Sequence, residues 1–227
     1  MSMKKKPESN RSALEPASIC LVLLSDTHQL HRELEIPDGD VLIHAGDFTL
    51  FSKSLQAIDD FNAWLGKLPH RHKIVVPGNH EFFLEEDRRR CSLLSHARVL
   101  INEGIEIEGL RIWGSPVTPL YGGAFGMSSA ADRMRLYAGI PEDVDVLVTH
   151  GPPHGILDRG RESEMHSGCA ELRNAVLRTR PKLHVFGHVH GGYGVLRGEH
   201  TMFVNAALFG ASGGLDHAPI VLRMSRT

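Results

Sequence analysis

The chain has 227 residues, of which 41% are hydrophobic, so it can fill a substantial core and disorder along most of its length is excluded. Its 25 Lys and Arg residues against 27 Asp and Glu residues give a formal net charge of −2, so no positive field favours duplex nucleic acid as a partner. The three cysteines are odd in number and lack C-x-x-C spacing, which argues against a disulfide framework and favours a cytoplasmic protein.

The first 17 residues are rich in Lys, Pro, Ser, Asn and Glu and have no apolar periodicity, which predicts a disordered tail over 1–17. Because no linker divides the remainder, a single domain is expected over 18–227. The apolar run Ile19–Leu24 is short and has no cleavage site after it, so it is interpreted as a strand and not as a secretory signal. No run approaches the roughly 18 to 20 apolar residues of a membrane-spanning helix, so no membrane partner is expected.

Five short runs rich in Val, Ile and Leu lack polar alternation, as strands buried on both faces do. These runs are Ile19–Leu24, Val41–Ile43, Ile74–Val76, Val146–Val148 and Leu183–Phe186. Apolar residues at helical spacing predict a helix over Leu55–Leu68, with Ser52 or Ser54 as its N-cap and Pro69 ending it. A second helix is expected between residues 168 and 181. The two β-α-β units predict an α/β fold.

Six further segments are short, closely spaced and separated by Gly or charged residues, as in antiparallel hairpins. They are Val99–Ile101, Ile105–Ile107, Leu110–Trp113, Val195–Leu196, Met202–Val204 and Ile220–Leu222. Mixed sheets are therefore expected. The Gly-, Pro- and Ser-rich connection from Gly114 to about Arg133 is long for a compact domain, and such loops are often functional.

Each of the five buried-strand runs leads into a segment dense in metal-binding side chains. The segments are Asp26-Thr27-His28, Gly46-Asp47, Gly78-Asn79-His80-Glu81, His150-Gly151 and Gly187-His188-Val189-His190. The carboxyl ends of parallel strands meet at one edge of a sheet, so these segments can build one site. Carboxylates, imidazoles and an amide without a thiolate suit Mn²⁺, Fe²⁺, Co²⁺ or Zn²⁺ in an open catalytic site. The donors are too many for one ion, which predicts a pair of ions suited to in-line displacement at phosphorus.

In this order the motifs resemble those of the calcineurin-like metallophosphoesterases. Four longer segments are similar to the metallophosphoesterase-domain (MPPED) branch, which is related to the class III cyclic nucleotide phosphodiesterases. These segments are Gly46–Thr49, Phe61–Gly66, Thr149–Pro153 and Arg180–His188. The resemblance extends from about Ile19 to Val204 and implies a four-layer α-β-β-α sandwich with two mixed β-sheets.

The resemblance also implies a role for each motif residue. It assigns the first metal to Asp26, His28, Asp47 and His190. It assigns the second metal to Asp47, Asn79, His150 and His188, with Asp47 as the bridge. His80 would bind the phosphate or protonate the departing oxygen. Asn79, His80 and His154 are the expected substrate contacts.

Two divalent transition-metal ions are expected, with Mn²⁺ favoured over Fe²⁺, Co²⁺ or Zn²⁺. Animal members of the MPPED branch have glycine where this chain has His188, so the chain is expected to hold a complete two-metal site. The function expected is a metal-dependent phosphodiesterase that hydrolyses small phosphodiesters, such as cyclic nucleotides, by attack of a metal-bridging hydroxide. A phosphomonoesterase or nucleotidase on the same core is the alternative, followed by a non-catalytic metal- or nucleotide-binding scaffold. The physiological substrate, the native metal and the oligomeric state stay open.

Several other residues have two interpretations. His44 and His184 are expected to be packing or supporting residues and not ligands. Glu81 either orients His80 or begins the next turn. Cys169 is expected to pack in the core, and the alternative is a nucleophile at the start of a helix.

Overall fold

The computed structural model describes residues 18–51, 53–119, 122–160 and 164–225. The predicted tail 1–17 and the N-cap alternative Ser52 lie outside these ranges. The tail and the extent of the domain therefore stay predictions. Within the described ranges, none of the helices is both long and apolar enough to cross a membrane.

The first sheet has the strand order β11-β1-β2-β3-β4. Its strands are β1 (Ser18–Leu24), β2 (Val41–His44), β3 (His72–Val75), β4 (Arg98–Val99) and β11 (Ile220–Ser225). Strands β1 to β4 run parallel, and β11 lies antiparallel to β1. The prediction that Val99–Ile101 belongs to an antiparallel hairpin is wrong. The chain between β3 and β4 passes through helical turns, and such a crossover returns the strand in the parallel direction.

The second sheet has the order β5-β6-β7-β8-β10-β9. Its strands are β5 (Glu103–Ile107), β6 (Leu110–Ser115), β7 (Val146–Thr149), β8 (Leu183–Phe186), β9 (Gly194–Arg197) and β10 (Met202–Asn205). The four inner strands run parallel, while β5 and β9 pair antiparallel at the two edges. Both sheets are therefore mixed, as predicted, and the five apolar runs form β1, β2, β3, β7 and β8.

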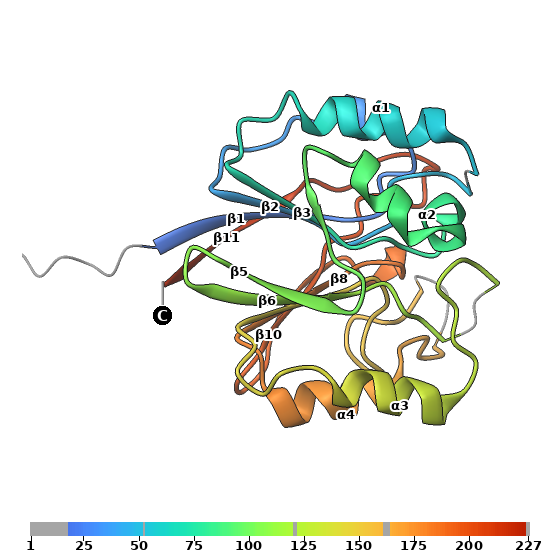
Figure 1. Cartoon of the computed structure of the whole chain (residues 1–227). Helices are drawn as coiled ribbons and strands as arrows, with labels where there is room; N and C mark the ends of the chain where they lie inside the picture. The colour runs from blue at the N-terminus through green and yellow to red at the C-terminus, as the bar shows by residue number, and fades with distance from the viewer. Residues whose placement is uncertain (1–17, 52, 120–121, 161–163, 226–227) are drawn as a thin grey trace, which may run out of the picture.

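Helices cover the outer face of each sheet, which gives the four-layer α-β-β-α sandwich that was expected (Figure 1). Helices α1 (Leu55–Leu65) and α2 (Phe82–Glu86) lie on the first sheet, and α3 (Ala130–Ala138) and α4 (Ala170–Thr179) lie on the second. The short 3₁₀ turns are η1 (His31–Glu33), η2 (Arg88–Leu93) and η3 (His190–Gly192).

The helix boundaries follow local chemistry. Helix α1 begins where the Ser54 hydroxyl accepts a hydrogen bond from the Gln56 N–H, and it ends at Gly66, before the predicted stop at Pro69. Helix α3 begins after Ser129, whose hydroxyl accepts from the Asp132 N–H. The predicted loop from Gly114 to Arg133 is therefore shortened at both ends, since β6 also extends through Ser115.

Three apolar layers separate the four structural layers. Ile43, Val148 and Val204 belong to the cluster between the two sheets. Phe61 and Trp64 anchor α1 on the first sheet, and α3 and α4 are anchored on the second sheet by a cluster that includes Tyr137, Leu172 and Phe186. Each fully buried large side chain contributes about 1.5 to 3 kcal/mol to stability. This packing fixes the two sheets face to face, so their strand ends meet along one boundary.

Candidate metal centre

The predicted ligand side chains meet where the strand ends of the two sheets adjoin. Asp26 and His28 follow β1, Asp47 follows β2, Asn79 and His80 follow β3, His150 follows β7, and His188 and His190 follow β8. Three groups bring their ligand atoms within 4.8 Å of one another. The groups are Asp26, His28 and His190; His28, Asp47 and His80; and Asp47, His150 and His188. Neighbouring groups share a residue, so they form one continuous cluster.

The first group joins β1 to β8. The Nε2 atom of His190 lies 3.3 Å from Oδ1 of Asp26 and 3.3 Å from Nε2 of His28. The Nδ1 atom of His28 lies 3.3 Å from the carbonyl oxygen of Thr49. A carbonyl can only accept, so Nδ1 of His28 carries the proton and its Nε2 lone pair faces the cluster, as in a metal-ligating histidine.

Asn79 lies beside the two histidines of the third group. The Oδ1 atom of Asn79 lies 2.8 Å from Nε2 of His150 and 2.8 Å from Nδ1 of His188. Nε2 of His150 is also 3.4 Å from Oδ2 of Asp47, while its Nδ1 donates to the carbonyl of Ala45 at 2.9 Å. Nε2 of His150 therefore faces two oxygen acceptors, and either a proton or a cation must lie between them.

The two aspartates carry negative charge in the interior. Asp26 is 0% exposed and Asp47 is 2% exposed. Burial opposes their ionisation, but His190 and His150 outweigh it and hold the pKa of Asp26 far below its usual range. For Asp47 burial is likewise outweighed, chiefly by His150, and its pKa is lowered. Buried carboxylates without compensating positive charge would be strongly destabilising.

The histidines respond to this charge in different ways. Burial lowers the pKa of His150, but Asp47 and Asp26 outweigh burial and raise it to about 9. Burial lowers the pKa of His188 to about 4, so its imidazole is neutral at pH 7. Charged carboxylates, a neutral imidazole and an amide oxygen are the donors that divalent transition metals prefer, and a metal can replace the proton of His150. The donor set fits two such ions.

Unusual backbone geometry places these side chains. Asp26, His28, Asp47 and His188 have φ values of 55°, 42°, 56° and 67°, in the left-handed region. Each such residue costs on the order of 1 kcal/mol or more and persists only where the surroundings impose it. Gly46 has φ 108°, and a Cβ there would collide with the ring of His150. Glycine is therefore required where the β2 and β7 loops touch.

Glu81 ties two of the ligand loops together. It is 0% exposed, and its carboxylate accepts hydrogen bonds from the N–H groups of Asp47 (2.9 Å), Thr49 (2.9 Å) and Gly78 (2.6 Å) and from the Thr49 hydroxyl (2.9 Å). Burial, and then the charge of Asp47, raises the pKa of Glu81 to about 7. Helix α2 also begins directly after it. The motif Gly-Asn-His-Glu was the sequence signal for Glu81 and includes its partner Gly78, but the partners Asp47 and Thr49 come from a distant loop.

His80 belongs to the second ligand group, and its Nε2 atom is directed toward Asp47. The main-chain N–H of His80 donates to Oδ1 of Asp47 at 2.9 Å. The ring atom Nε2 of His80 is 3.7 Å from Oδ2 of Asp47. Nδ1 of His80 accepts a hydrogen bond from the N–H of Phe51 at 3.3 Å. Burial lowers the pKa of His80, so the neutral ring carries its proton on Nε2. A hydrogen-bond donor therefore faces the cluster.

The other residues singled out in the sequence lie outside the three ligand groups. His154 is exposed, its carbonyl accepts from Arg173 at 2.7 Å, and its ring lies 5.1 Å from that of His166. Its role as a substrate contact stays a prediction. Cys169 is 3% exposed and packs under α4, and burial raises its pKa to about 11. A buried, protonated thiol favours the packing interpretation over the nucleophile.

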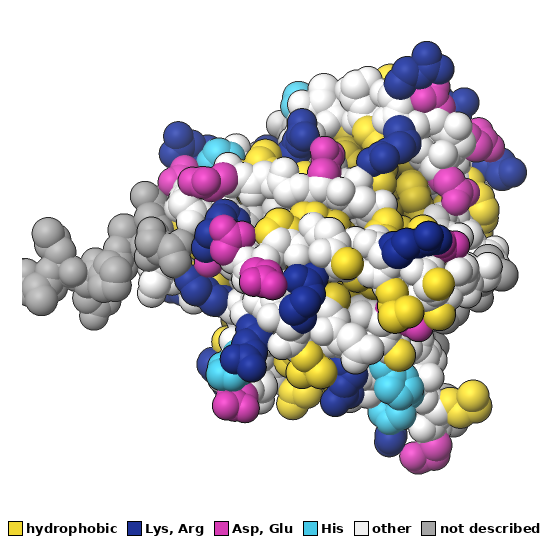
Figure 2. Space-filling view, turned by 60° about the horizontal axis from the view of Figure 1, so that its bottom comes forward, with side chains coloured by type: hydrophobic (Ala, Val, Ile, Leu, Met, Phe, Trp, Pro, Cys, Tyr) yellow, Lys and Arg dark blue, Asp and Glu magenta, His cyan; other side chains and the backbone are white. Residues whose placement is uncertain are grey.

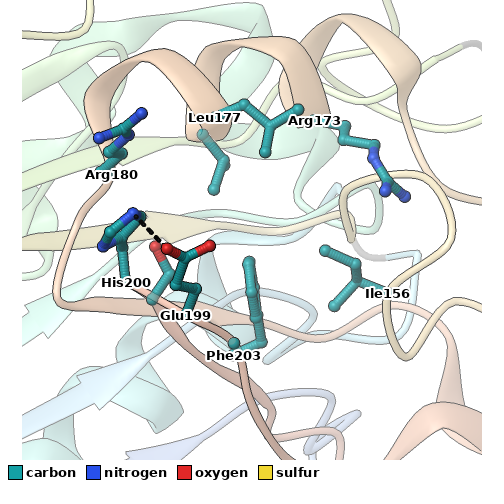
Figure 3. A pocket seen from close by; sticks show the side chains of 10 residues that line it. Ile156, Arg173, Leu177, Arg180, Glu199, His200 and Phe203 are labelled. Atoms are coloured by element: carbon teal, nitrogen blue, oxygen red, sulfur yellow. Dashed lines mark ion pairs between the residues drawn. The ribbon is translucent and has the colours of Figure 1, made fainter.

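A cavity of about 420 Å³ lies away from the cluster, between α4 and the β9–β10 hairpin (Figure 3). Leu177 and Phe203 line it together with Arg173 and Arg180, and Nε2 of His200 lies 3.5 Å from Oε1 of Glu199. On the face of the molecule in Figure 2, basic and acidic side chains are interspersed and not segregated by sign. None of the predicted ligands lines this cavity.

A model of the calcineurin-like phosphoesterase family matches residues 21–192. This range includes every residue of the three ligand groups. The chain belongs to the calcineurin-like phosphoesterase family. Members of this family are metallophosphoesterases, and the cluster at the strand ends contains His and Asp side chains that could hold a divalent metal.

Curated relatives within the calcineurin-like phosphoesterase family cover most of the chain. Metallophosphoesterase domain-containing protein 1 of Homo sapiens is 37% identical over 233 residues, which is 91% of this chain and 71% of the human protein. UPF0046 protein C25E10.12 of Caenorhabditis elegans is 42% identical over 209 residues, 82% of this chain and 74% of that protein. The similarity to the MPPED branch is thereby confirmed.

A solved crystal structure superposes on 93% of this chain and 100% of its own chain with a TM-score of 0.66 and 16% sequence identity. At that identity the likeness concerns the fold alone. It agrees with two packed mixed sheets covered by helices, the architecture expected for a calcineurin-like phosphoesterase.

Proposed function

We propose that the chain is a metal-dependent phosphodiesterase that hydrolyses small phosphodiesters such as cyclic nucleotides. The observation that carries this proposal is the joining of the three ligand groups into one cluster through His28 and Asp47. Membership of the calcineurin-like phosphoesterase family supports hydrolysis of phosphoric esters, and the similarity to metallophosphoesterase domain-containing protein 1 supports the choice of branch.

The proposed ligand assignment is built on the first and third groups, with Asp47 added to the first and Asn79 added to the third. Asp26, His28, Asp47 and His190 would hold one ion, and Asp47, Asn79, His150 and His188 would hold the second. Two divalent ions bound there, with Mn²⁺ favoured, would polarise the phosphoryl oxygens and make water nucleophilic at neutral pH. The protein contributes the fixed geometry, since backbone carbonyls orient the rings of His28 and His150 from outside.

His80 is the proposed hydrogen-bond or proton donor to the ester. Its Nε2–H faces the cluster because Nδ1 is occupied by the Phe51 N–H. In this position it would donate to a phosphoryl oxygen or protonate the departing oxygen, a contribution of typically 10²- to 10⁴-fold in rate. Asn79 is the second proposed substrate contact, and His154 is a third from the exposed loop after β7.

A substrate panel tests the proposal. Purified protein is stripped with a chelator, reloaded with Mn²⁺, Fe²⁺, Zn²⁺ or Mg²⁺, and assayed with 2′,3′- and 3′,5′-cyclic nucleotides, nucleoside monophosphates and a simple aryl diester. We expect Mn²⁺-dependent hydrolysis of the diesters. Faster hydrolysis of the monophosphates would identify a nucleotidase on the same core. Fewer than one metal ion per chain after Mn²⁺ loading would contradict the proposed centre, and metal binding without turnover would identify a scaffold.

A further inference from the structure

Two consecutive apolar side chains are exposed directly after the β2 ligand loop. Leu50 is 54% exposed and Phe51 is 57% exposed, only three and four positions after Asp47. Single exposed apolar residues are common on proteins, but these two are adjacent and lie directly after a loop that carries a proposed metal ligand.

The ring of Phe51 lies on the ring of His80. The ring centroids are 3.6 Å apart and the planes are inclined by 25°, so the two rings are stacked. Because more than half of Phe51 is exposed, the part of its ring that does not cover His80 is open to solvent. Phe51 therefore extends the face of His80 outward as an apolar surface.

The backbone holds Phe51 in this place at a cost. Its φ is 50°, a left-handed conformation that is unfavourable for a bulky side chain. The hydrogen bond from its N–H to Nδ1 of His80 helps to hold this conformation. The neighbouring Thr49 is fixed in turn, because its N–H and hydroxyl both donate to Glu81. Contacts that hold a strained residue next to a site indicate that the position of its ring is selected.

Phe209 provides a contrast on the other side of the cluster. Its ring lies 5.0 Å from that of His28 and 5.3 Å from that of His190, in edge and tilted geometries, and the residue is only partly exposed. Phe209 packs against two proposed metal ligands. Phe51 instead contacts the residue proposed to meet the departing oxygen.

We propose that Phe51 is a specificity-determining platform that favours phosphodiesters whose leaving group carries an aryl or nucleobase ring. The inference rests on the proposed function of His80. If His80 protonates the departing oxygen, the leaving group attached to that oxygen lies alongside the exposed part of the Phe51 ring, because this ring is stacked on His80. Stacking of a base on an aromatic side chain changes affinity by on the order of tenfold or more.

The test compares two diesters with leaving groups of similar acidity but different shape: methyl phenyl phosphate and methyl hexafluoroisopropyl phosphate. Their kcat/KM values are measured for the Mn²⁺-loaded wild type, Phe51→Ala and Phe51→Tyr. We expect Phe51→Ala to reduce the preference for the phenyl ester by on the order of tenfold and Phe51→Tyr to retain it. Both substitutions keep the main-chain N–H that binds His80. Leu177→Ala, which truncates an exposed residue on α4, is the control and should keep the wild-type preference.

Binding is measured separately by calorimetry, with phenylphosphonate and methylphosphonate as probes. Phe51→Ala should weaken phenylphosphonate selectively. If both esters lose activity by the same factor, Phe51 acts only through the placement of His80 and the platform is wrong. An unchanged preference would also overturn it. If the wild-type protein hydrolyses neither ester, both the proposed function and the platform are wrong. If the wild type hydrolyses the esters and Phe51→Ala keeps the same preference between them, only the platform is wrong.

Discussion

Two sets of buried histidines in this molecule differ in their neighbours and not in their burial. His44, His184 and His150 are all 0% exposed. Burial lowers the pKa of His44 and of His184 to about 3, whereas Asp47 and Asp26 overcome burial and raise the pKa of His150 to about 9. Asp26 and Asp47 also act on His44, but His150 has the Asp47 carboxylate 3.4 Å from its Nε2 atom. Direct contact with a carboxylate, and not burial, therefore distinguishes the histidine that attracts positive charge.

The neutral histidines support the strand-end loops from behind. Gly46 N–H donates to Nδ1 of His44 at 3.2 Å, so Nε2 of His44 donates to the Thr27 hydroxyl at 3.0 Å. In the second sheet the Thr149 hydroxyl lies 2.7 Å from the carbonyl oxygen of Gly151 and 2.9 Å from Nε2 of His184. These contacts agree with the expectation that His44 and His184 are supporting residues.

The largest expected effect comes from removing the charge that distinguishes the two sets. Asp47→Asn keeps the shape of the side chain but removes the carboxylate nearest to both His150 and His80. Loss of several kcal/mol of charge stabilisation should lower kcat/KM by on the order of 10³-fold or more. Metal content by mass spectrometry should fall in parallel. Asp59→Asn, on the exposed face of α1, is the matched control, and full activity of the Asp47 variant would remove the basis for a shared ligand.

Metal removal tests the role of the Asp26 and Asp47 carboxylates without mutation. Ions that bind only the folded state stabilise it by about 2.7 kcal/mol at a concentration of 100 times Kd. We therefore expect Mn²⁺ to restore turnover after chelation and to raise the melting temperature of the wild type. The shift should be absent in Asp47→Asn. An equal rise in both proteins would show that the ion binds elsewhere.

A smaller effect is expected from Glu81→Gln. The carboxylate accepts hydrogen bonds at both oxygens, so an amide NH₂ in place of one oxygen would face N–H donors. Above the pKa of Glu81, which is about 7, loss of hydrogen bonds to the charged carboxylate should cost about 1.5 to 3 kcal/mol each in the free energy of unfolding. Urea denaturation measures this loss, and metal affinity should also decline because the Asp47 loop is released. A variant as stable as the wild type would mean that the loops after β2 and β3 keep their structure without the hydrogen bonds to the Glu81 carboxylate.

The pH dependence of stability tests His184 directly. In the unfolded chain the imidazole binds a proton below its usual pKa of 6.5, while the folded residue does so only near pH 3, so acid favours unfolding between these values. Wild-type stability should fall by about 1.4 kcal/mol per pH unit more steeply than that of His184→Met in this window. Urea titrations of metal-free protein at pH 6 and pH 5 provide the slopes, with exposed His96→Met as control. Parallel slopes for wild type and the His184 variant would contradict a neutral buried imidazole.

The smallest effect is expected at Cys169. Its thiol is buried in the packing layer under α4, and its pKa is raised to about 11. Cys169→Ala should leave kcat/KM unchanged within error and cost about 1 kcal/mol in stability. Iodoacetamide should fail to inactivate the wild type. Inactivation that tracks alkylation of Cys169 would restore the nucleophile interpretation.

The sequence predicted the elements that depend on local pattern. An apolar run followed by a polar turn, which contains glycine in four of the five cases, identified all five strands behind the cluster. Parallel strand ends predicted that their side chains would meet. The direction of β4 was not predictable in this way, because short apolar segments look alike in parallel and antiparallel sheets. The left-handed conformations of Asp26 and Asp47 also left no local signal, since tertiary contacts impose them.

The partners of single side chains were less predictable than their positions. Glu81 and His80 are neighbours in the chain, yet the carboxylate of one binds the loop after β2 and the ring of the other lies under Phe51. Both contacts depend on how the loops after β2 and β3 pack. Likewise, the pKa of His150 differs from that of His184 because carboxylates lie near His150, and those carboxylates follow other strands.

The first and third ligand groups each combine side chains from both sheets. His188 N–H donates to the Asp26 carboxylate at 3.0 and 3.1 Å, which links residues 162 positions apart. A chain cut between β6 and α3 would thus leave Asp26, Asp47 and Asn79 on one fragment and the proposed ligands His150, His188 and His190 on the other. Metal uptake by the mixed fragments would report their reassembly, which suits this scaffold to a split-protein sensor.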